Sequence, residues 1–225
     1  EQHQEICRES WNKKSKVMNI KVCGITQLKQ LQQLEALNID FAGLIFYKDS
    51  PRYMGDKISG KEIKKADFDI KKVGVFVNPG YSELLDAIDE YGLDIVQLHG
   101  NENPEMCEEL SAEVEVIKAF RIEDSADIDK IVEPYDAVCD YYLFDTAGLK
   151  ESFGGTGRQF DWGILKKAKI EKPFFLSGGI GLDDAQKVKA FSHPDFFAID
   201  INSKFETAPG VKDMAAILKF LQAFK

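Results

Sequence analysis

The chain has 225 residues, of which 44% are apolar, 30% charged and 11% aromatic. This composition is typical of a globular protein with a substantial core, in one large or two small domains. No apolar run approaches the roughly 20 residues that span a membrane. The first residues lack the apolar stretch of a secretory signal. We therefore expect neither a membrane protein nor an exported one.

The charge balance argues against polyanionic partners. The chain carries 29 basic and 38 acidic residues, a net charge of −9. Such a chain repels nucleic acid and anionic lipid unless basic groups are concentrated locally, so we expect no nucleic-acid or membrane partner.

The cysteine pattern argues against a metal site. None of the four cysteines lies in a Cys-x-x-Cys pair, so the pattern predicts neither a zinc site nor a redox motif. Reduced thiols are typical of a cytoplasmic protein, which is the location we expect.

From Asn19 onward, short apolar runs alternate with amphipathic stretches. Most runs are continuously apolar, as expected for parallel strands covered on both faces. The expected strands, in chain order, are residues 20–23, 41–46, 73–77, 94–98, 114–120, 141–144, 174–176 and 196–201.

Apolar residues between these runs recur at helical spacing. The last such segment, residues 213–224, predicts a helix with one apolar face. The residues expected on that face are Met214, Ile217, Leu218 and Leu221.

Eight strand–helix pairs predict an α/β fold, a single-domain (β/α)8 TIM barrel over residues 19–225. A doubly wound open sheet shows the same alternation. The barrel is favoured because no Gly-x-Gly-x-x-Gly follows the first strand and the glycine-rich turns come late. Residues 1–18 fall outside the pattern, and we expect a poorly ordered N-terminal extension or a helix outside the barrel.

Chemistry in a barrel lies at the carboxyl ends of the strands. Cys23 ends the first expected strand, where a thiolate could act as base or nucleophile, or the side chain could simply be buried. Asp145 follows the sixth strand, where a carboxylate is paired, catalytic or caps the next loop. Together the two could flank one ligand as an acid–base pair.

Glycine-rich turns suggest a phosphate site. Gly178-Gly179 and Asn202-Ser203 follow adjacent late strands, so backbone amides and a helix N-terminus could hold a phosphate there. The loop of Gly154, Gly155, Thr156 and Gly157 could approach an anion, act as a lid or be a flexible connection.

Three further polar residues have two interpretations each. Arg52 lies in a proline-stiffened turn and could bind a carboxylate or form a surface ion pair. His99 ends an apolar strand and could be functional or structural. Lys118 could form a Schiff base in an aldolase-type barrel, although it lies two residues before the strand end.

These motifs, in order and in register, resemble those of the phosphoribosylanthranilate isomerases of tryptophan biosynthesis. The resemblance covers the chain from Lys21 to the C-terminus. The motifs that carry it are Lys21-Val-Cys-Gly-Ile-Thr26, Phe46-Tyr-Lys-Asp-Ser-Pro-Arg-Tyr53, Val73-Gly-Val-Phe-Val-Asn78, Val96-Gln-Leu-His-Gly100, Phe144-Asp-Thr146, Gly154-Gly-Thr-Gly-Arg158, Phe160-Asp-Trp162, Ser177-Gly-Gly179 and Pro209-Gly-Val-Lys-Asp213.

The resemblance implies a cofactor-free Amadori rearrangement of a sugar phosphate, N-(5-phosphoribosyl)anthranilate. By the same resemblance, Asp145 matches the general acid that opens the furanose ring, and Cys23 matches the base that removes the C2′ proton. Arg52 matches an arginine near the anthranilate carboxylate, and His99 a substrate-positioning residue. The phosphate-binding positions match Gly178, Gly179, Asn202 and Ser203, with Gly155, Thr156 and Gly157 in a mobile sixth loop. We expect a monomer or a homodimer.

One motif departs from the family pattern. Asn202-Ser203-Lys204 stands where Ser-Ser-Gly is usual, which would alter the loop if a positive φ were required at Lys204. Two alternatives to this isomerase stay open, another sugar-phosphate enzyme and a binding barrel. Another sugar-phosphate isomerase or lyase could use the same barrel, but an aldolase needs a lysine at a strand end. The related histidine-pathway isomerase is expected to carry aspartate in place of Cys23. A non-enzymatic binding barrel would have lost the acid–base pair.

Overall fold

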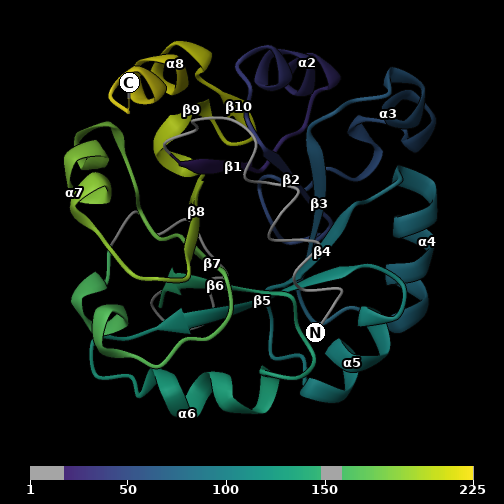
Figure 1. The fold of residues 1–225 in the computed structure, drawn as a ribbon. Helices are drawn as coiled ribbons and strands as arrows, with labels where there is room; N and C mark the ends of the chain where they lie inside the picture. Colours follow the sequence, from purple (N-terminus) through teal and green to yellow (C-terminus); the bar gives the residue numbers. More distant parts are fainter. Residues whose placement is uncertain (1–17, 148–158, 225) are drawn as a thin grey trace.

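The protein forms a closed barrel of eight parallel strands in chain order, with β1 paired to β8. The computed structural model describes residues 18–147 and 159–224. Figure 1 shows the strands at the centre of a ring of helices. The strands are β1 (Asn19–Cys23), β2 (Phe41–Ile45), β3 (Lys71–Phe76), β4 (Ile95–Leu98), β5 (Glu115–Ile122), β6 (Tyr141–Thr146), β7 (Phe174–Leu176) and β8 (Phe196–Ile201).

The described helices follow the strands in turn and cover the outside of the barrel. The connection from β6 to β7 differs, since its described part holds a 3₁₀ stretch, η3 (Trp162–Lys167). The α-helices are α2 (Leu28–Ala36), α3 (Gly60–Ala66), α4 (Tyr81–Tyr91), α5 (Pro104–Ser111), α6 (Ile128–Val132), α7 (Ala185–Ala190) and α8 (Met214–Gln222). Short 3₁₀ turns lie at η1 (Gly55–Lys57), η2 (Glu133–Tyr135), η4 (Leu182–Asp184) and η5 (Ser203–Phe205), and β9 (Glu206–Ala208) pairs with β10 (Val211–Lys212).

Strand residues alternate between two cores. Val73 and Val75 point into the barrel, while Phe76 belongs to the larger core between strands and helices. Because both strand faces are buried, the strand sequences are continuously apolar. The barrel interior is filled by Cys23, Phe41, Ile45, Val73, Val75, Ile95, Ile117, Ala119, Tyr141, Leu143, Phe175 and Ala198.

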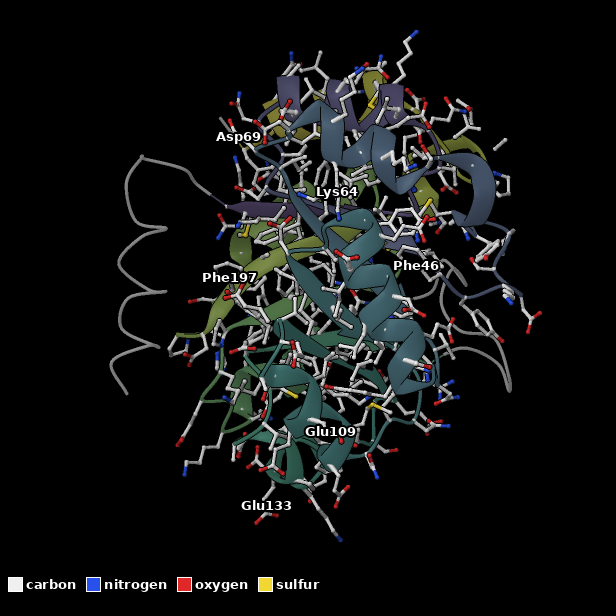
Figure 2. All side chains as sticks on the ribbon, turned by 90° about the vertical axis from the view of Figure 1, so that its right-hand side faces the viewer. Phe46, Lys64, Asp69, Glu109, Glu133 and Phe197 are labelled. Carbon is white, nitrogen blue, oxygen red and sulfur yellow. The ribbon has the colours of Figure 1, made fainter. Side chains whose placement is uncertain are left out.

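Phe197 lies near the start of β8 and Phe46 follows β2, and Figure 2 shows Phe197 towards the left and Phe46 towards the right of the barrel. On the outside, Lys64 of α3 reaches Asp89 of α4 at 3.4 Å, which links two neighbouring helices. No helix in the described ranges is long and apolar enough to cross a membrane.

The predicted barrel is confirmed, and each expected strand is present with small shifts of its ends. β6 continues through Thr146, so Asp145 lies within the strand, opposite Arg121 of β5, rather than just after it. The expected apolar face of α8 is partly wrong. Ile217 is buried, but Leu218 is 42% exposed and Phe220 is buried in its place. Except for Met18, the expected extension lies outside the described residues.

Candidate active site

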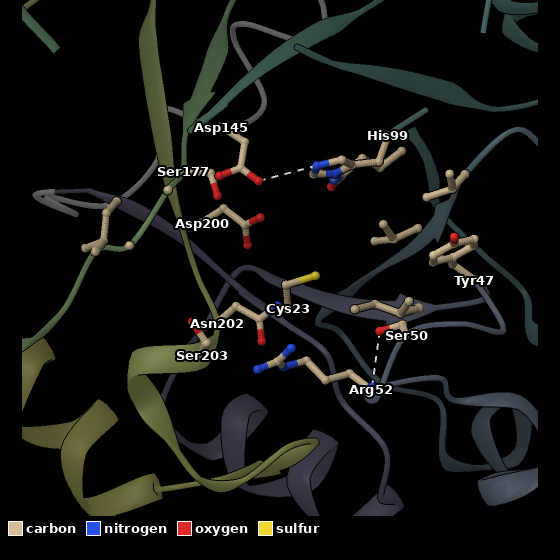
Figure 3. Close-up of a pocket in the computed structure, with 17 residues that line it drawn as sticks. Cys23, Tyr47, Ser50, Arg52, His99, Asp145, Ser177, Asp200, Asn202 and Ser203 are labelled. Carbon is tan, nitrogen blue, oxygen red and sulfur yellow. Dashed lines mark hydrogen bonds and ion pairs between the residues drawn. The ribbon is translucent and has the colours of Figure 1, made fainter. Parts of the chain in front are cut away.

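A cavity that is open to solvent lies at the carboxyl ends of the strands. It brings together the described residues that the resemblance assigns to the site, but not Lys118, while Gly155, Thr156 and Gly157 lie outside the described residues. Figure 3 shows the polar side chains that converge there from different strands. The candidates on its wall are Cys23, Arg52, His99, Asp145, Gly178, Gly179, Asn202 and Ser203.

Cys23 ends β1 inside the barrel and is 5% exposed. Its neighbour across the strand pair is Gly43 of β2, which leaves room for the sulfur. Burial raises the pKa of the Cys23 thiol above its ordinary value, and the charge of Lys21 partly opposes this effect. The thiol is therefore in contact with the cavity yet held in a largely dehydrated setting.

An ion pair not recognised from the sequence lies beside Cys23. Lys21 Nζ is 3.0 Å from Asp200 Oδ2, and both side chains are buried. Burial raises the pKa of Asp200 above its ordinary value, although the charge of Lys21 works against the rise. A signal was present in the sequence, because each residue is a charge inside an apolar strand run.

Asp145 faces His99 across the cavity, as the dashed line in Figure 3 shows. Asp145 Oδ2 is 3.4 Å from His99 Nε2, and its Oδ1 accepts a 2.8 Å bond from the backbone N–H of Thr146. The His99 contact is within ion-pair range but lacks hydrogen-bond geometry. Gln97 Nε2 lies 2.7 Å from His99 Nδ1.

Arg52 is held by a partner within the chain. Its Nε lies 3.0 Å from both carboxylate oxygens of Glu206, and Nη2 lies 2.8 Å from Oε2. Lys212 Nζ also donates to Glu206 Oε1 and to Asn202 Oδ1, each at 2.7 Å. The Glu206 side chain is only 4% exposed and that of Arg52 13%, so this is a half-buried pair at the cavity rather than the surface ion pair considered from the sequence.

The turn after β7 is formed by two consecutive glycines with positive φ. Gly178 and Gly179 have φ values of +93° and +65°, and both line the cavity. Gln159 Nε2 donates to the carbonyl of Gly179 at 3.1 Å, which ties this turn to the segment after β6. The helix expected beyond Asn202 is only the 3₁₀ turn η5.

The departure at Lys204 does not strain the backbone. Among the described residues, the non-glycine positions with positive φ are Asn38, Asp67 and Asn78, so Lys204 is not one of them. A glycine is therefore not required at this position for the turn to form.

Lys118 lies outside the cavity. Its Nζ is 2.9 Å from Glu102 Oε2 and donates to the backbone carbonyls of Leu98, Gly100 and Ala119. Its strand neighbours Ile117 and Ala119 face the barrel interior, so Lys118 faces the helices. An aldolase-type Schiff base at Lys118 is therefore not supported.

The fold and the site define a (β/α)8-barrel enzyme, with its chemical groups gathered at the carboxyl ends of the strands. Residues 20–223 match the family model described as N-(5'phosphoribosyl)anthranilate (PRA) isomerase. The chain belongs to this family of isomerases of tryptophan biosynthesis, which confirms the resemblance found in the motifs.

Individual relatives support the assignment over nearly the whole length. The chain is 42% identical over 207 residues to N-(5'-phosphoribosyl)anthranilate isomerase of Parabacteroides distasonis, which covers 91% of this chain and 92% of the relative. The crystal structure of phosphoribosyl anthranilate isomerase from Thermus thermophilus superimposes with a TM-score of 0.79 at 28% identity, covering 92% and 98%. A second solved isomerase is in complex with reduced 1-(o-carboxyphenylamino)-1-deoxyribulose 5-phosphate, at a TM-score of 0.74, 28% identity and coverage of 92% and 98%.

Proposed function

We propose that the chain converts N-(5-phosphoribosyl)anthranilate to 1-(o-carboxyphenylamino)-1-deoxyribulose 5-phosphate, with Cys23 as general base and Asp145 as general acid. The observation that carries the assignment is that these two side chains line one cavity from strands β1 and β6. Asp200 lies between them in Figure 3. The solved relative in complex with the reduced product supports the same choice of substrate.

The proposed steps need one acid and one base at different atoms. Asp145 gives a proton to the furanose oxygen, and the bond from that oxygen to C1′ breaks to leave a Schiff base. The Cys23 thiolate then removes the C2′ proton, which yields an enolamine. Loss of the C2′ hydroxyl proton and protonation at C1′ give the ketone, so the net reaction is an isomerisation that needs no cofactor.

The remaining candidates are assigned to binding. Gly178, Gly179, Asn202 and Ser203 line the cavity after the adjacent strands β7 and β8, where backbone N–H groups suit a phosphate. Arg52 is assigned to the anthranilate carboxylate and His99 to substrate positioning. Gly155, Thr156 and Gly157 are assigned to a loop that covers the ligand. We further propose a cytoplasmic monomer or homodimer.

Arg52 is already paired with Glu206, so it would bind the substrate carboxylate while keeping this first partner. Glu206 already occupies its Nε and Nη2 atoms in a fixed bidentate pair. That pair orients the guanidinium along the cavity wall, so the substrate carboxylate would approach the remaining edge. Lys212 provides a second positive charge beside Glu206, so the cluster of Arg52, Glu206 and Lys212 is net positive and can still attract a carboxylate.

The test follows the loss of substrate fluorescence when purified protein meets freshly made phosphoribosylanthranilate. We expect cofactor-free decay above the spontaneous rate in the wild type and almost none in Cys23→Ala or Asp145→Asn. Cys139→Ala is the matched control, because Cys139 is equally buried but lies outside the cavity. Rates near wild type in either site variant contradict the acid–base assignment. No decay with the wild type points to another sugar phosphate.

A further inference from the structure

Lys21 occupies an unusual place for a lysine. It precedes Cys23 by two residues in β1, and side chains at that spacing share one face of a strand. Its neighbours in register are Phe41 of β2 and Asp200 of β8. Its side chain is 0% exposed, so the ammonium lies within the barrel interior, one layer below the thiol.

A gain in folding stability does not explain why the Lys21–Asp200 ion pair is buried here. A buried ion pair repays its desolvation only when the remaining polar atoms are satisfied, and apolar replacements are often as stable. Asp200 Oδ2 is paired with Lys21, but the buried Oδ1 has no hydrogen-bond partner among the described residues. The pair is therefore incomplete within the described structure, and Asp200 lines the cavity.

We propose that Lys21 is a positioning residue that stabilises the thiolate of Cys23 when the substrate proton is removed, and that the carboxylate of Asp200, paired with Lys21, limits this stabilisation. This inference rests on the proposed base role of Cys23. Lys21 does not touch the substrate, since its side chain is enclosed by the barrel.

Charges from several elements act on the thiol. Burial raises the pKa of Cys23, the charges of Lys21 and Lys212 lower it, and the charge of Asp200 raises it. Lys212 is already engaged by Asn202 and Glu206. Lys21 donates to Asp200 at 3.0 Å, so it acts on the thiol through the proximity of its charge. The other charged or titratable groups on the cavity wall are Tyr47, Arg52, His99 and Asp145.

Because these charges oppose each other, we expect two variants to shift the pH midpoint of Cys23 alkylation in opposite directions. The experiment measures the rate at which iodoacetamide alkylates Cys23 against pH in the free enzyme, with the Cys23 peptide quantified by mass spectrometry. For Lys21→Met we expect the midpoint to rise by about one to three pH units, the usual effect of losing a nearby opposite charge. For Asp200→Asn we expect it to fall, and Lys21→Arg should restore most of the wild-type profile.

Turnover provides a second readout. At neutral pH, Lys21→Met should lose at least about tenfold in kcat, which corresponds to one pH unit of thiolate population. KM should change little, because Lys21 makes no substrate contact. A merely structural lysine would instead lower the amount of folded protein without moving the alkylation profile.

Lys118→Met is the matched control, because Lys118 is also buried and paired with a carboxylate, at 2.9 Å from Glu102, but lies outside the cavity. The rate of Cys23 alkylation against pH in this variant should equal that of the wild type. An unchanged profile in Lys21→Met, or an unchanged or raised midpoint in Asp200→Asn, overturns the proposal. Should Lys21→Met not fold, Asp200→Asn and Lys21→Arg still decide it. Turnover by Cys23→Ala would instead overturn the base role, whatever the alkylation profiles show.

Discussion

Gly43 and Cys23 lie directly opposite each other in β2 and β1, and a Cβ atom at Gly43 would lie 2.7 Å from the Cys23 sulfur. That separation is far below van der Waals contact, so a side chain at Gly43 would displace the thiol. The backbone there cannot yield easily, because the Gly43 carbonyl accepts from the N–H groups of Gly24 and Ile25, each at 2.9 Å.

Gly43→Ala should therefore fold but lose at least about tenfold in kcat, since a displacement near 1 Å costs on the order of 100-fold. Circular dichroism checks that the variant folds, and steady-state kinetics measures the loss of kcat. Gly80→Ala is the control, because a Cβ there meets nothing within 4 Å. A wild-type kcat in Gly43→Ala would show that the position of the sulfur does not matter.

The turn at Gly178 should matter for binding rather than for chemistry. Its φ of +93° disfavours any other residue, and a Cβ atom would lie 2.8 Å from the backbone nitrogen of Thr146. We expect Gly178→Ala to raise KM and to weaken competitive inhibition by inorganic phosphate.

Gly181→Ala separates this effect from a general loss of glycine, because a Cβ there is no closer than 3.6 Å to its neighbours. The control should keep the wild-type KM and phosphate inhibition. Equal KM values for Gly178→Ala and the wild type would remove this turn from the phosphate site.

Lys118 and Glu102 should govern stability. Glu102 accepts from the backbone N–H groups of Asn78 and Gly100 at 2.8 and 3.0 Å, so the pair joins the loops after β3 and β4. Removing one partner of a buried ion pair costs about 3–5 kcal/mol, because the other charge is left unpaired. Urea unfolding of Lys118→Met should show a loss of this size.

The folded fraction of Lys118→Met should keep a KM and kcat close to those of the wild type. If Lys118→Met instead lost turnover while keeping the stability of the wild type, Lys118 would have a role in the active site.

Most of the barrel could be predicted because parallel strands buried on both faces leave a continuous apolar signature. The Cys23–Asp145 pair was likewise visible, as polar side chains at predicted strand ends. The contact of Arg52 with Glu206 was not, since it joins residues 154 positions apart that no local pattern relates. The exposure of Leu218 was missed because several apolar residues of α8 competed for one buried face.

Lys21 and Asp200 show a different limit. Each was visible as a charge in an apolar run, but their pairing depends on closure of the barrel, which brings β1 beside β8. An open sheet with the same strands would leave these residues at opposite edges. The ion pair is thus a consequence of topology, which the local sequence patterns do not reveal.

The cluster of Arg52, Glu206 and Lys212 should make the free energy of unfolding sensitive to acid. Burial alone would raise the pKa of Glu206, but hydrogen bonds from Arg52 and Lys212 outweigh it and hold the pKa below its ordinary value. A carboxylate whose folded pKa is depressed stabilises the fold above its unfolded pKa of about 4.3, and this contribution is lost as pH falls through the folded value.

Glu206→Gln should consequently be destabilised relative to the wild type at pH 7, with a smaller difference at acid pH. Urea unfolding of both proteins at pH 7 and in steps below pH 5 measures the two gaps. The exposed Glu83 in the first turn of α4 supplies the comparison, and Glu83→Gln should follow the wild-type curve. A gap between Glu206→Gln and the wild type that is constant with pH would show that packing, and not the charge of Glu206, stabilises this side of the cavity.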